Sequence, residues 1–262
     1  MAVLQVIGGG KMGEALVAGL VRAGTAAVDV LVVEKDPGRV AALHAALPGV
    51  AVSDRPAPSE GTILAVKPGD VPAVCAQVAE AGTGRVLSIA AGVTIATLEA
   101  ALAAGTPVIR AMPNTPATVG VGAAAIAPGA SAGEDDLVWA EGLLGAVGMV
   151  VRVDESLLDA VTGLSGSGPA YVFLVAEALI AAGEQVGLPS QVAYDLAVQT
   201  LLGAATLLAG SDLGPEALRA AVTSPNGTTA AGLAVMEERG LRAAIAAGVV
   251  AATERSRELG RG

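Results

Sequence analysis

Side chains that usually carry acid–base or nucleophilic chemistry are scarce in this sequence. It contains one histidine, His44, and one cysteine, Cys75. Single copies exclude a disulfide framework and a cysteine–histidine metal site within one chain, and we expect no metal site. A lone cysteine also fits a reducing compartment. Lysine occurs only at Lys11, Lys35 and Lys67, so no lysine or histidine follows Lys67.

Aromatic residues and positive charge are also in short supply. Aromatic residues make up 2% of the chain and hydrophobic residues 53%, so the core must consist mainly of alanine, valine and leucine. Small side chains of this kind allow helices to pack closely. The formal net charge is -10, which disfavours nucleic acid and anionic membranes as partners. We therefore expect neither, and predict a small-molecule substrate.

No stretch of the sequence is typical of a targeting or membrane segment. The apolar residues 3–7 run directly into a glycine turn without a basic region before them, unlike a signal peptide. The longest uncharged stretch, residues 111–133, is interrupted by Pro113, Pro116 and Pro128, which would break a membrane-spanning helix. We expect a soluble, cytoplasmic protein, and 262 residues suffice for one large domain or two ordinary ones.

A glycine-rich turn lies at the start of the chain, in the sequence V-L-Q-V-I-G-G-G-K-M-G of residues 3–13. An apolar strand, a G-x-G-x-x-G turn and an apolar-periodic helix follow one another, as in a dinucleotide-binding fingerprint. The first glycine would allow the tight turn, the second the approach of a pyrophosphate, and the third close packing of helix on strand. The helix N-terminus would attract the phosphates. The predicted cofactor-binding residues here are Gly8, Gly10, Lys11, Met12 and Gly13.

Three charged residues follow the second predicted strand and point to different cofactors. Glu34 lies at the strand end, about 20 residues beyond the glycine turn, where an acidic residue binds the ribose 2′-hydroxyl of NAD. Lys35 and Arg39 lie beside it and would suit the 2′-phosphate of NADP. Solvated surface charges are the alternative for all three. The sequence therefore leaves NADPH and NADH both open.

Strands and helices alternate through the first part of the chain. Near-continuous apolar strands separated by helices indicate a doubly wound, mostly parallel sheet of the Rossmann type. The predicted strands are residues 3–7, 28–33, 50–52, 62–66, 85–89, 107–112, 119–127 and 149–153. Helices are predicted after the glycine turn and at residues 37–47, 70–79, 94–102 and 134–144. We predict a dinucleotide-binding domain over residues 1–153.

The remainder of the chain, residues 154–262, is predicted to be an all-helical domain. Helices are expected at residues 157–162, 170–185, 191–208, 215–221, 228–238 and 241–259. Residues 170–182 carry only Glu177 as a charge. A helix that is apolar nearly all round must be buried on every side, and in a small domain this favours burial against another subunit. A compact monomeric bundle is the alternative.

Several polar residues follow strands at the carboxyl edge of the predicted sheet, where ligands bind in this fold. Lys67 and Pro68 follow the fourth strand, residues 88–92 end the fifth, and residues 110–116 end the sixth. Two prolines stiffen the last of these loops, which would hold polar groups over a cofactor. Ordinary rigid turns are the alternative.

Two polar, glycine-containing stretches occur in the helical half. Residues 162–169 do not fit G-x-S-x-G and have no nearby histidine, which argues against a serine nucleophile; they read as a flexible approach to a helix. Residues 223–229 form a hydroxyl-rich turn before a helix N-terminus, an arrangement that suits a carboxylate. An N-cap with spare hydroxyls is the alternative for the second stretch.

The absence of lysine and histidine after Lys67 bears on the chemistry. A dehydrogenase that acts on alcohols usually needs a proton acceptor whose pKa lies near neutrality. An imine substrate relaxes this need, because its own nitrogen carries the proton while hydride attacks the carbon. The protein then supplies geometry, a carboxylate anchor and a weak donor, and this sequence suits that reaction.

Seven stretches, in order along nearly the whole chain, resemble the pyrroline-5-carboxylate reductase family. They are I-G-G-G-K-M-G-E-A-L at 7–16, A-V-K-P at 65–68, S-I-A-A-G-V-T-I at 88–95, R-A-M-P-N-T-P at 110–116, D-A-V-T-G-L-S-G-S-G-P-A-Y at 159–171, G-L-P at 187–189 and S-P-N-G-T-T at 224–229. The later long stretches are far more specific than the glycine fingerprint.

The resemblance implies reduction of 1-pyrroline-5-carboxylate to L-proline with NADPH or NADH, the last step of proline biosynthesis. It also implies a helical substrate-binding and dimerisation domain over residues 154–262, with dimers often stacked into decamers. Further cofactor-binding residues implied are Ala65, Val66, Lys67, Pro68, Ala90 and Ala91. Substrate-binding residues implied are Ser224, Gly227, Thr228 and Thr229, with the Thr229 hydroxyl as catalytic proton donor.

The chain departs from the family pattern at a few positions. Glu34 is unexpected in a strongly NADP-dependent member, and Asn226 and Thr228 stand where relatives often have glycine and alanine. The runner-up function, a β-hydroxyacid dehydrogenase, would need a catalytic lysine on the first long helix of the second domain, which has none. A sensor that binds NADPH without turnover is a third candidate, and a methyltransferase is a more remote one.

Overall fold

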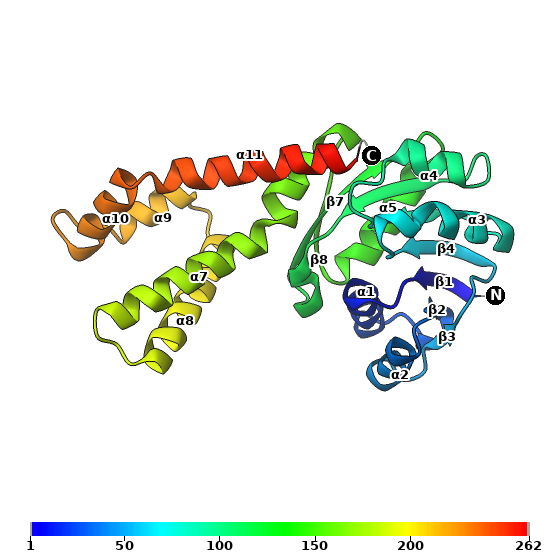
Figure 1. Ribbon diagram of the computed structural model, residues 1–262, viewed down its shortest axis with the longest axis horizontal. Helices are drawn as coiled ribbons and strands as arrows, with labels where there is room; N and C mark the ends of the chain where they lie inside the picture. Colours follow the sequence, from blue (N-terminus) through cyan, green and yellow to red (C-terminus); the bar gives the residue numbers. More distant parts are fainter. Residues whose placement is uncertain (1, 261–262) are drawn as a thin grey trace. The chain divides into compact units, whose positions relative to one another are not determined.

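The computed structural model describes residues 2–260, which divide into two compact units (Figure 1). The first comprises residues 2–167 and 250–260, and the second comprises residues 168–249. The predicted division at residue 153 follows the end of the last strand, and the described residues beyond it are helical or irregular. As a division of function, 1–153 and 154–262 remain predictions.

The first unit contains an eight-stranded sheet in the order β3-β2-β1-β4-β5-β6-β7-β8. Its strands are β1 (Ala2–Ile7), β2 (Val30–Val33), β3 (Ala51–Ser53), β4 (Ser59–Leu64), β5 (Val86–Ser88), β6 (Val108–Met112), β7 (Gly122–Pro128) and β8 (Gly148–Arg152). The pairs from β3 to β6 are all parallel. The order reverses at β1, which confirms the doubly wound, mostly parallel fold.

Strand β7 runs antiparallel to β6, with Ile109 opposite Pro128 and Met112 opposite Ala125. The connection, residues 113–121, holds only the short 3₁₀ helix η3 (Thr115–Val119). A parallel crossover needs roughly a dozen or more residues and usually an α-helix, so this short link forces the chain to reverse. Helix α5 (Glu134–Gly145) then provides the crossover that makes β8 parallel to β7.

Two helices of the first unit begin at a residue whose side chain caps them. Asp36 caps α2 by accepting a hydrogen bond from the backbone N–H of Arg39, and Thr94 caps α4 through the N–H of Thr97. The helices are α1 (Lys11–Arg22), α2 (Pro37–Ala46), α3 (Val71–Ala81), α4 (Ile95–Ala101), α5, α6 (Leu158–Val161) and the end of α11 (Leu241–Leu259), with 3₁₀ turns η1 (Ala27–Asp29), η2 (Pro68–Asp70) and η4 (Glu155–Leu157). The strand predicted from residue 28 therefore starts later, because η1 occupies its first residues.

Both faces of the sheet are covered, because neighbouring side chains of each strand point to opposite sides. Val6 packs in one cluster with Leu16 of α1 and with residues of α2 and α5. Its neighbour Ile7 packs in the other cluster, with Cys75 of α3 and Leu98 of α4. The carboxyl ends of β1, β2 and β4 are thus held rigidly between two apolar layers, and the loops that follow them are placed by this core.

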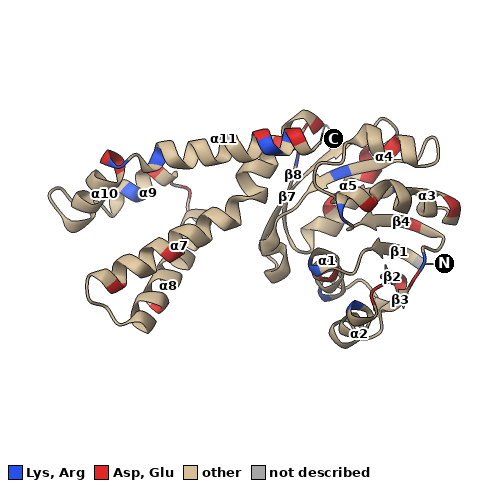
Figure 2. Ribbon diagram, in the orientation of Figure 1, with Lys and Arg blue, Asp and Glu red and all other residues tan. Residues whose placement is uncertain are grey.

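The second unit is a set of helices: α7 (Gly168–Gln185), α8 (Ser190–Ala209), α9 (Pro215–Ala221), α10 (Thr228–Glu238) and the first part of α11. Helices α7 and α8 pack closely where Gly183 meets Ala193. No residue of α7 is buried in the single chain, and Phe173 and Leu174 are 63% and 65% exposed. Figure 2 shows few charges on these two helices. Helix α7, which the sequence predicts to be buried on every side, is therefore not buried by the other residues of a single chain.

Two helical segments, Glu155–Gln185 and Ser190–Ala209, are also long and apolar enough to cross a membrane. Length and composition alone do not separate such segments from helices that pack against another protein surface. The sequence expectation of no such segment rested on the longest uncharged stretch, residues 111–133, which forms the end of β6, η3, β7 and loops.

Candidate active site

The glycine turn after β1 has the geometry that its three glycines require. Gly8 has a φ of +105°, and a Cβ there would collide with the carbonyl oxygen of Ala65. A Cβ on Gly13 would collide with the carbonyl oxygen of Gly8, so α1 packs directly on the turn. At Gly10, by contrast, no atom of the described residues other than Gly10 and its two chain neighbours lies within 4 Å of the Cβ position. The turn is closed toward the protein and open at Gly10, which fits the approach of a pyrophosphate.

This turn opens on a cavity of about 520 Å³ at the carboxyl edge of β1, β2 and β4. The volume lies in the range of small-molecule and cofactor sites. Predicted cofactor residues that line it are Gly8, Gly10, Glu34, Lys35, Ala65, Val66 and Lys67. The other lining residues are Ile7, Val33, Pro56, Asp70, Ala73, Val74 and Gln77. Residues distant in sequence thus surround one hollow beside an exposed helix N-terminus.

The remaining predicted cofactor residues lie outside the lining of this cavity. Lys11, Met12 and Gly13 form the start of α1, and Pro68 opens η2. Ala90 is buried and Ala91 exposed, in the turn that follows β5. Their part in binding therefore stays a prediction.

The Glu34 carboxylate is tied to the glycine turn. Its Oε2 accepts a hydrogen bond from the backbone N–H of Gly9 at 3.0 Å. Its Oε1 accepts from the backbone N–H groups of Lys35 at 2.7 Å and Asp36 at 2.9 Å. Hydrogen bonds to an ionised carboxylate are roughly twice as strong as neutral ones, so Glu34 is fixed in place at the end of β2.

Arg39 is turned away from the role that its sequence position suggested. Its guanidinium donates to the carbonyl oxygen of Gly9, with Nε at 3.0 Å, and pairs with Glu14 at 2.6 Å. The guanidinium therefore braces the glycine turn against α1. Sequence analysis overlooked Gly9 and Glu14, because an acidic residue in the first turn of a helix is favourable by itself and gives no sign of a partner on another helix.

The R-A-M-P-N-T-P loop and the residues after α6 meet through Asn114. The Asn114 Nδ2 donates to the carbonyl oxygen of Ser165 at 3.1 Å, and its Oδ1 accepts from the N–H of Ala123 at 2.8 Å. Ser165 lies in a π-helical turn, η5 (Thr162–Gly166), and Gly166 packs on Met112. The expected flexible approach to a helix is therefore wrong: this stretch is a wound, hydrogen-bonded turn, of a kind frequent at functional sites.

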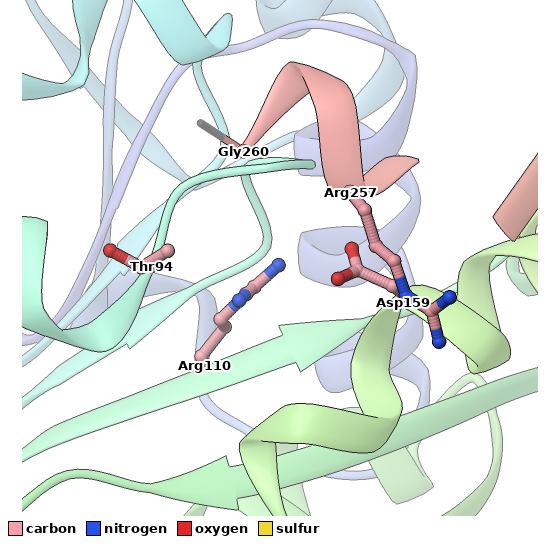
Figure 3. A pocket seen from close by; sticks show the side chains of 5 residues that line it. All are labelled: Thr94, Arg110, Asp159, Arg257 and Gly260. Atoms are coloured by element: carbon pink, nitrogen blue, oxygen red, sulfur yellow. The ribbon is translucent and has the colours of Figure 1, made fainter. Parts of the chain in front are cut away.

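A second cavity, of about 300 Å³, lies beside the last turn of α11, where Figure 3 shows Arg110, Asp159 and Arg257 gathered with Thr94 and Gly260. Buried Arg110 pairs with Glu155 at 2.9 Å. Asp159 accepts a hydrogen bond from Ser256 at 2.6 Å. The cluster holds two guanidinium groups and two carboxylates, and the hydrogen bond from Ser256 to Asp159 ties the end of α11 to α6. No predicted site residue lines it.

The predicted substrate residues form a turn before α10 in the second unit. The N–H of Gly227 donates to the carbonyl oxygen of Ser224 at 3.0 Å, and Asn226 has a φ of +59°. With proline at the second position this is the pattern of a type II turn. Glycine suits the third position best and asparagine is a tolerated substitute, which accounts for Asn226 where the resemblance led us to expect glycine.

Helix α10 begins directly after this turn, with Gly227 as its N-cap. Its first backbone bond runs from the N–H of Ala231 to the carbonyl oxygen of Gly227, so the N–H groups ahead of Ala231 have no partner inside the helix. Ser224, Thr228 and Thr229 are exposed beside them. Hydroxyls and unpaired N–H groups at the positive end of a helix dipole suit a carboxylate.

Family models match both parts of the chain. Residues 155–259 match the model described as "Pyrroline-5-carboxylate reductase dimerisation". Residues 3–92 match the model described as "NADP oxidoreductase coenzyme F420-dependent".

Curated relatives match over the full length. A pyrroline-5-carboxylate reductase of Mycobacterium tuberculosis is 45% identical, over 99% of this chain and 97% of the relative. One from Synechocystis sp. is 45% identical, over 98% of each chain.

Solved structures agree with these matches. A pyrroline-5-carboxylate reductase from Coxiella burnetii superposes with a TM-score of 0.92 at 34% identity, over 98% of each chain. A pyrroline carboxylate reductase of Plasmodium falciparum with NADP bound gives a TM-score of 0.83 at 26% identity, over 99% of this chain and 98% of that one. With relatives of this identity matched from end to end, the chain belongs to the pyrroline-5-carboxylate reductase family.

Proposed function

We propose that this protein reduces 1-pyrroline-5-carboxylate to L-proline, the last step of proline biosynthesis, with NADPH or NADH as reductant. The observation that carries the proposal is a glycine turn, open at Gly10 to a cavity of about 520 Å³, in a chain 45% identical over its length to pyrroline-5-carboxylate reductases. The absence of lysine and histidine after Lys67 agrees with a cyclic imine as substrate.

The cofactor, when bound, supplies the hydride that the reaction consumes. Gly8, Gly10 and Gly13 shape the turn, and the N–H groups of Lys11 and Met12 at the start of α1 hold the pyrophosphate. The N-terminal dipole of α1 adds to this attraction. Ala65, Val66 and Lys67 line the cofactor cavity, and in this proposal Pro68, Ala90 and Ala91, which lie outside that lining, complete the cofactor site.

The substrate carboxylate binds at the N-terminus of α10. The hydroxyls of Ser224, Thr228 and Thr229 and the unpaired N–H groups after Gly227 together offer several hydrogen-bond donors. Since every one of these donors is neutral, the attraction for a carboxylate comes from their number and from the helix dipole. Anchoring the carboxylate fixes the orientation of the five-membered ring.

Thr229 is the proposed catalytic residue. Hydride adds to the carbon of the C=N bond, the π electrons move to the nitrogen, and the nitrogen ends as a neutral secondary amine once it holds a proton. A hydroxyl beside the ring nitrogen donates a hydrogen bond to it and passes on a proton, which water then restores. Such proton transfer typically contributes a factor of about 100 to 10,000 to the rate.

The exposed apolar helices of the second unit form the interface of a homodimer, and dimers stack further into a decamer. Phe173 and Leu174 of α7 are examples of large apolar side chains that one chain leaves uncovered. A patch of this kind marks an interaction surface, and the match of residues 155–259 to a dimerisation model favours a second copy as the cover. Covered in this way, the two long apolar helices need no membrane, and we place the protein in the cytoplasm.

The test is the reaction itself. Purified protein is mixed with 1-pyrroline-5-carboxylate and either NADPH or NADH, and nicotinamide absorbance is followed while the product is identified as L-proline. We expect oxidation that depends on the imine, with no reduction of the oxidised cofactor when a β-hydroxy acid is offered. Measurable cofactor binding without any turnover would contradict the proposal and favour a sensor.

A further inference from the structure

The Glu34 carboxylate has one acceptor position left over after its contacts with the protein. An ionised carboxylate offers about four acceptor positions. Three are taken by the backbone N–H groups of Lys35, Asp36 and Gly9, of which Gly9 alone bonds to Oε2. The remaining position belongs to Oε2, and Glu34 lines the cofactor cavity. A ligand that fills this cavity therefore meets a fixed negative charge with room for one more donor.

From this arrangement we infer that the site selects a free ribose 2′-hydroxyl, so that NADH binds more tightly than NADPH, with Glu34 as the specificity-determining residue. The inference rests on the proposed function, and names which of its two cofactors the chain takes. A 2′-hydroxyl donates to Oε2. A phosphate ester at the same place carries a charge of about -1.5 to -2 and no donor when fully ionised, so it meets repulsion where the hydroxyl finds a partner.

Glu34 is held too firmly to move aside for a phosphate. Rotation of its side chain would break three hydrogen bonds at once. One of them satisfies Gly9, whose backbone is buried under Leu43. A buried N–H left without a partner is costly, so the glycine turn and the acidic side chain stay together as one rigid element.

Arg39 does not offset this charge. Its guanidinium is shared between the Gly9 carbonyl and the Glu14 carboxylate, at 2.6 Å from the latter. Its positive charge is therefore compensated before any ligand enters. In a site built for a 2′-phosphate, an arginine near this position would face the ligand, whereas here Glu14 holds it beneath the turn.

Of the two lysines that line the cavity, only Lys35 is near enough to compete. Lys67 follows β4, and the order β2-β1-β4 places it two strands from Glu34, on the order of 10 Å at the usual strand spacing. Lys35 is exposed and adjacent to Glu34. The charge of Lys35 is balanced by that of the fixed Glu34 carboxylate, so this part of the cavity has no net positive charge to attract a phosphate.

The test is cofactor binding, measured by titration calorimetry on the intact wild-type protein without substrate. We expect the Kd for NADH to be at least tenfold below that for NADPH, which corresponds to about 1.4 kcal/mol. ADP and adenosine 2′,5′-bisphosphate serve as probes that lack the nicotinamide, and should differ in the same direction. Equal binding, or tighter binding of NADPH, would overturn the inference.

Two variants locate the cause of the preference. Glu34→Gln removes the charge at nearly constant size, and should reduce the NADH-to-NADPH preference at least tenfold, mainly by tightening NADPH. Glu14→Gln leaves Glu34 untouched but releases Arg39, and should also tighten NADPH. The matched control is Glu60→Gln, an exposed carboxylate on β4 outside the cavity, which should leave both Kd values unchanged. A Glu34→Gln protein whose ratio of the two Kd values equals that of the wild type would contradict the role assigned to Glu34. Glu14→Gln retains the Glu34 contacts, so it tests the inference even if Glu34→Gln fails to fold.

The outcomes separate the inference from the proposed function. Tighter NADPH binding together with reduction of the imine would overturn the inference and leave the function standing. Failure of both dinucleotides to bind would overturn both.

Discussion

The side-chain amide of Asn114 donates to the backbone carbonyl of Ser165 at 3.1 Å, joining the loop after β6 to the π-helical turn η5. The same amide accepts a hydrogen bond from Ala123 on β7. One side chain thus fixes three segments that are separate in the sequence and that carry two of the family's most specific motifs.

Replacing this amide should loosen the loop. Asn114→Ala removes two hydrogen bonds, each worth about 0.5–1.5 kcal/mol, so we expect the free energy of unfolding to fall by about 1–3 kcal/mol. Amide hydrogen exchange at residues 162–166 should rise as η5 loses its tie. The control is Thr115→Ala, an exposed neighbour, and an Asn114→Ala protein with the same unfolding curve as this control would refute the role given to the amide.

Thr229→Val should reduce turnover without weakening cofactor binding. Valine keeps the shape of threonine but has no hydroxyl, so kcat should fall by about 100-fold or more if the hydroxyl moves the proton. The Kd for NADH should stay within about twofold of the wild-type value, because Thr229 lies in α10, whereas the glycine turn that binds the cofactor lies before α1. Thr229→Ser, which keeps the hydroxyl, should retain most activity. Wild-type kcat in the valine variant would remove the catalytic assignment.

A charge on the exposed face of α7 should disrupt assembly. Leu174 is 65% exposed in the single chain, and in the proposed dimer a buried carboxylate at this position would carry a heavy desolvation cost. Leu174→Glu should therefore shift the mass measured by analytical ultracentrifugation toward the monomer. Glu238→Gln, an exposed position at the end of α10, is the control. An unchanged mass for Leu174→Glu would place the interface elsewhere.

The buried thiol of Cys75 should make the free energy of unfolding fall at alkaline pH. Burial raises the pKa of its thiol from the ordinary value of 9.0 to about 11. A raised folded-state pKa means that the thiol's contribution is fully present below pH 9.0, and is lost as pH rises toward about 11, because the unfolded chain ionises first. The wild type should therefore lose stability across this range more steeply than Cys75→Ala in urea unfolding. Identical pH slopes for the two proteins would show that the thiol is not protected by burial.

The local chemistry of the glycine turn could be predicted from sequence, because it depends on residues adjacent in the chain. The φ of +105° at Gly8 and the close packing at Gly13 follow from the fingerprint spacing. The position of Glu34 at the end of β2 follows in the same way. Strand and helix positions are also predictable, since long apolar runs and clear caps determine them.

What the sequence does not predict depends on contacts between separate elements. Arg39 resembles a phosphate ligand in the sequence, but Glu14, on another helix, holds it. The reversal of β7 depends on a link too short for a crossover, and its apolar pattern alone does not give strand direction. The composition of residues 162–166 suggests a flexible segment because glycine and serine rarely favour a helix, whereas Asn114 and Met112 stabilise the π turn from outside.

The most direct test of the proposed reaction follows the hydride itself. NADH carrying deuterium at C4 of the nicotinamide, as a pair of stereoisomers, is mixed with 1-pyrroline-5-carboxylate and the purified protein, and the product is examined by NMR and mass spectrometry. The account predicts L-proline with one deuterium at the carbon of the former C=N bond, from one of the two stereoisomers. Proline without deuterium from either isomer, or no proline while the cofactor remains bound, would contradict hydride transfer to the cyclic imine.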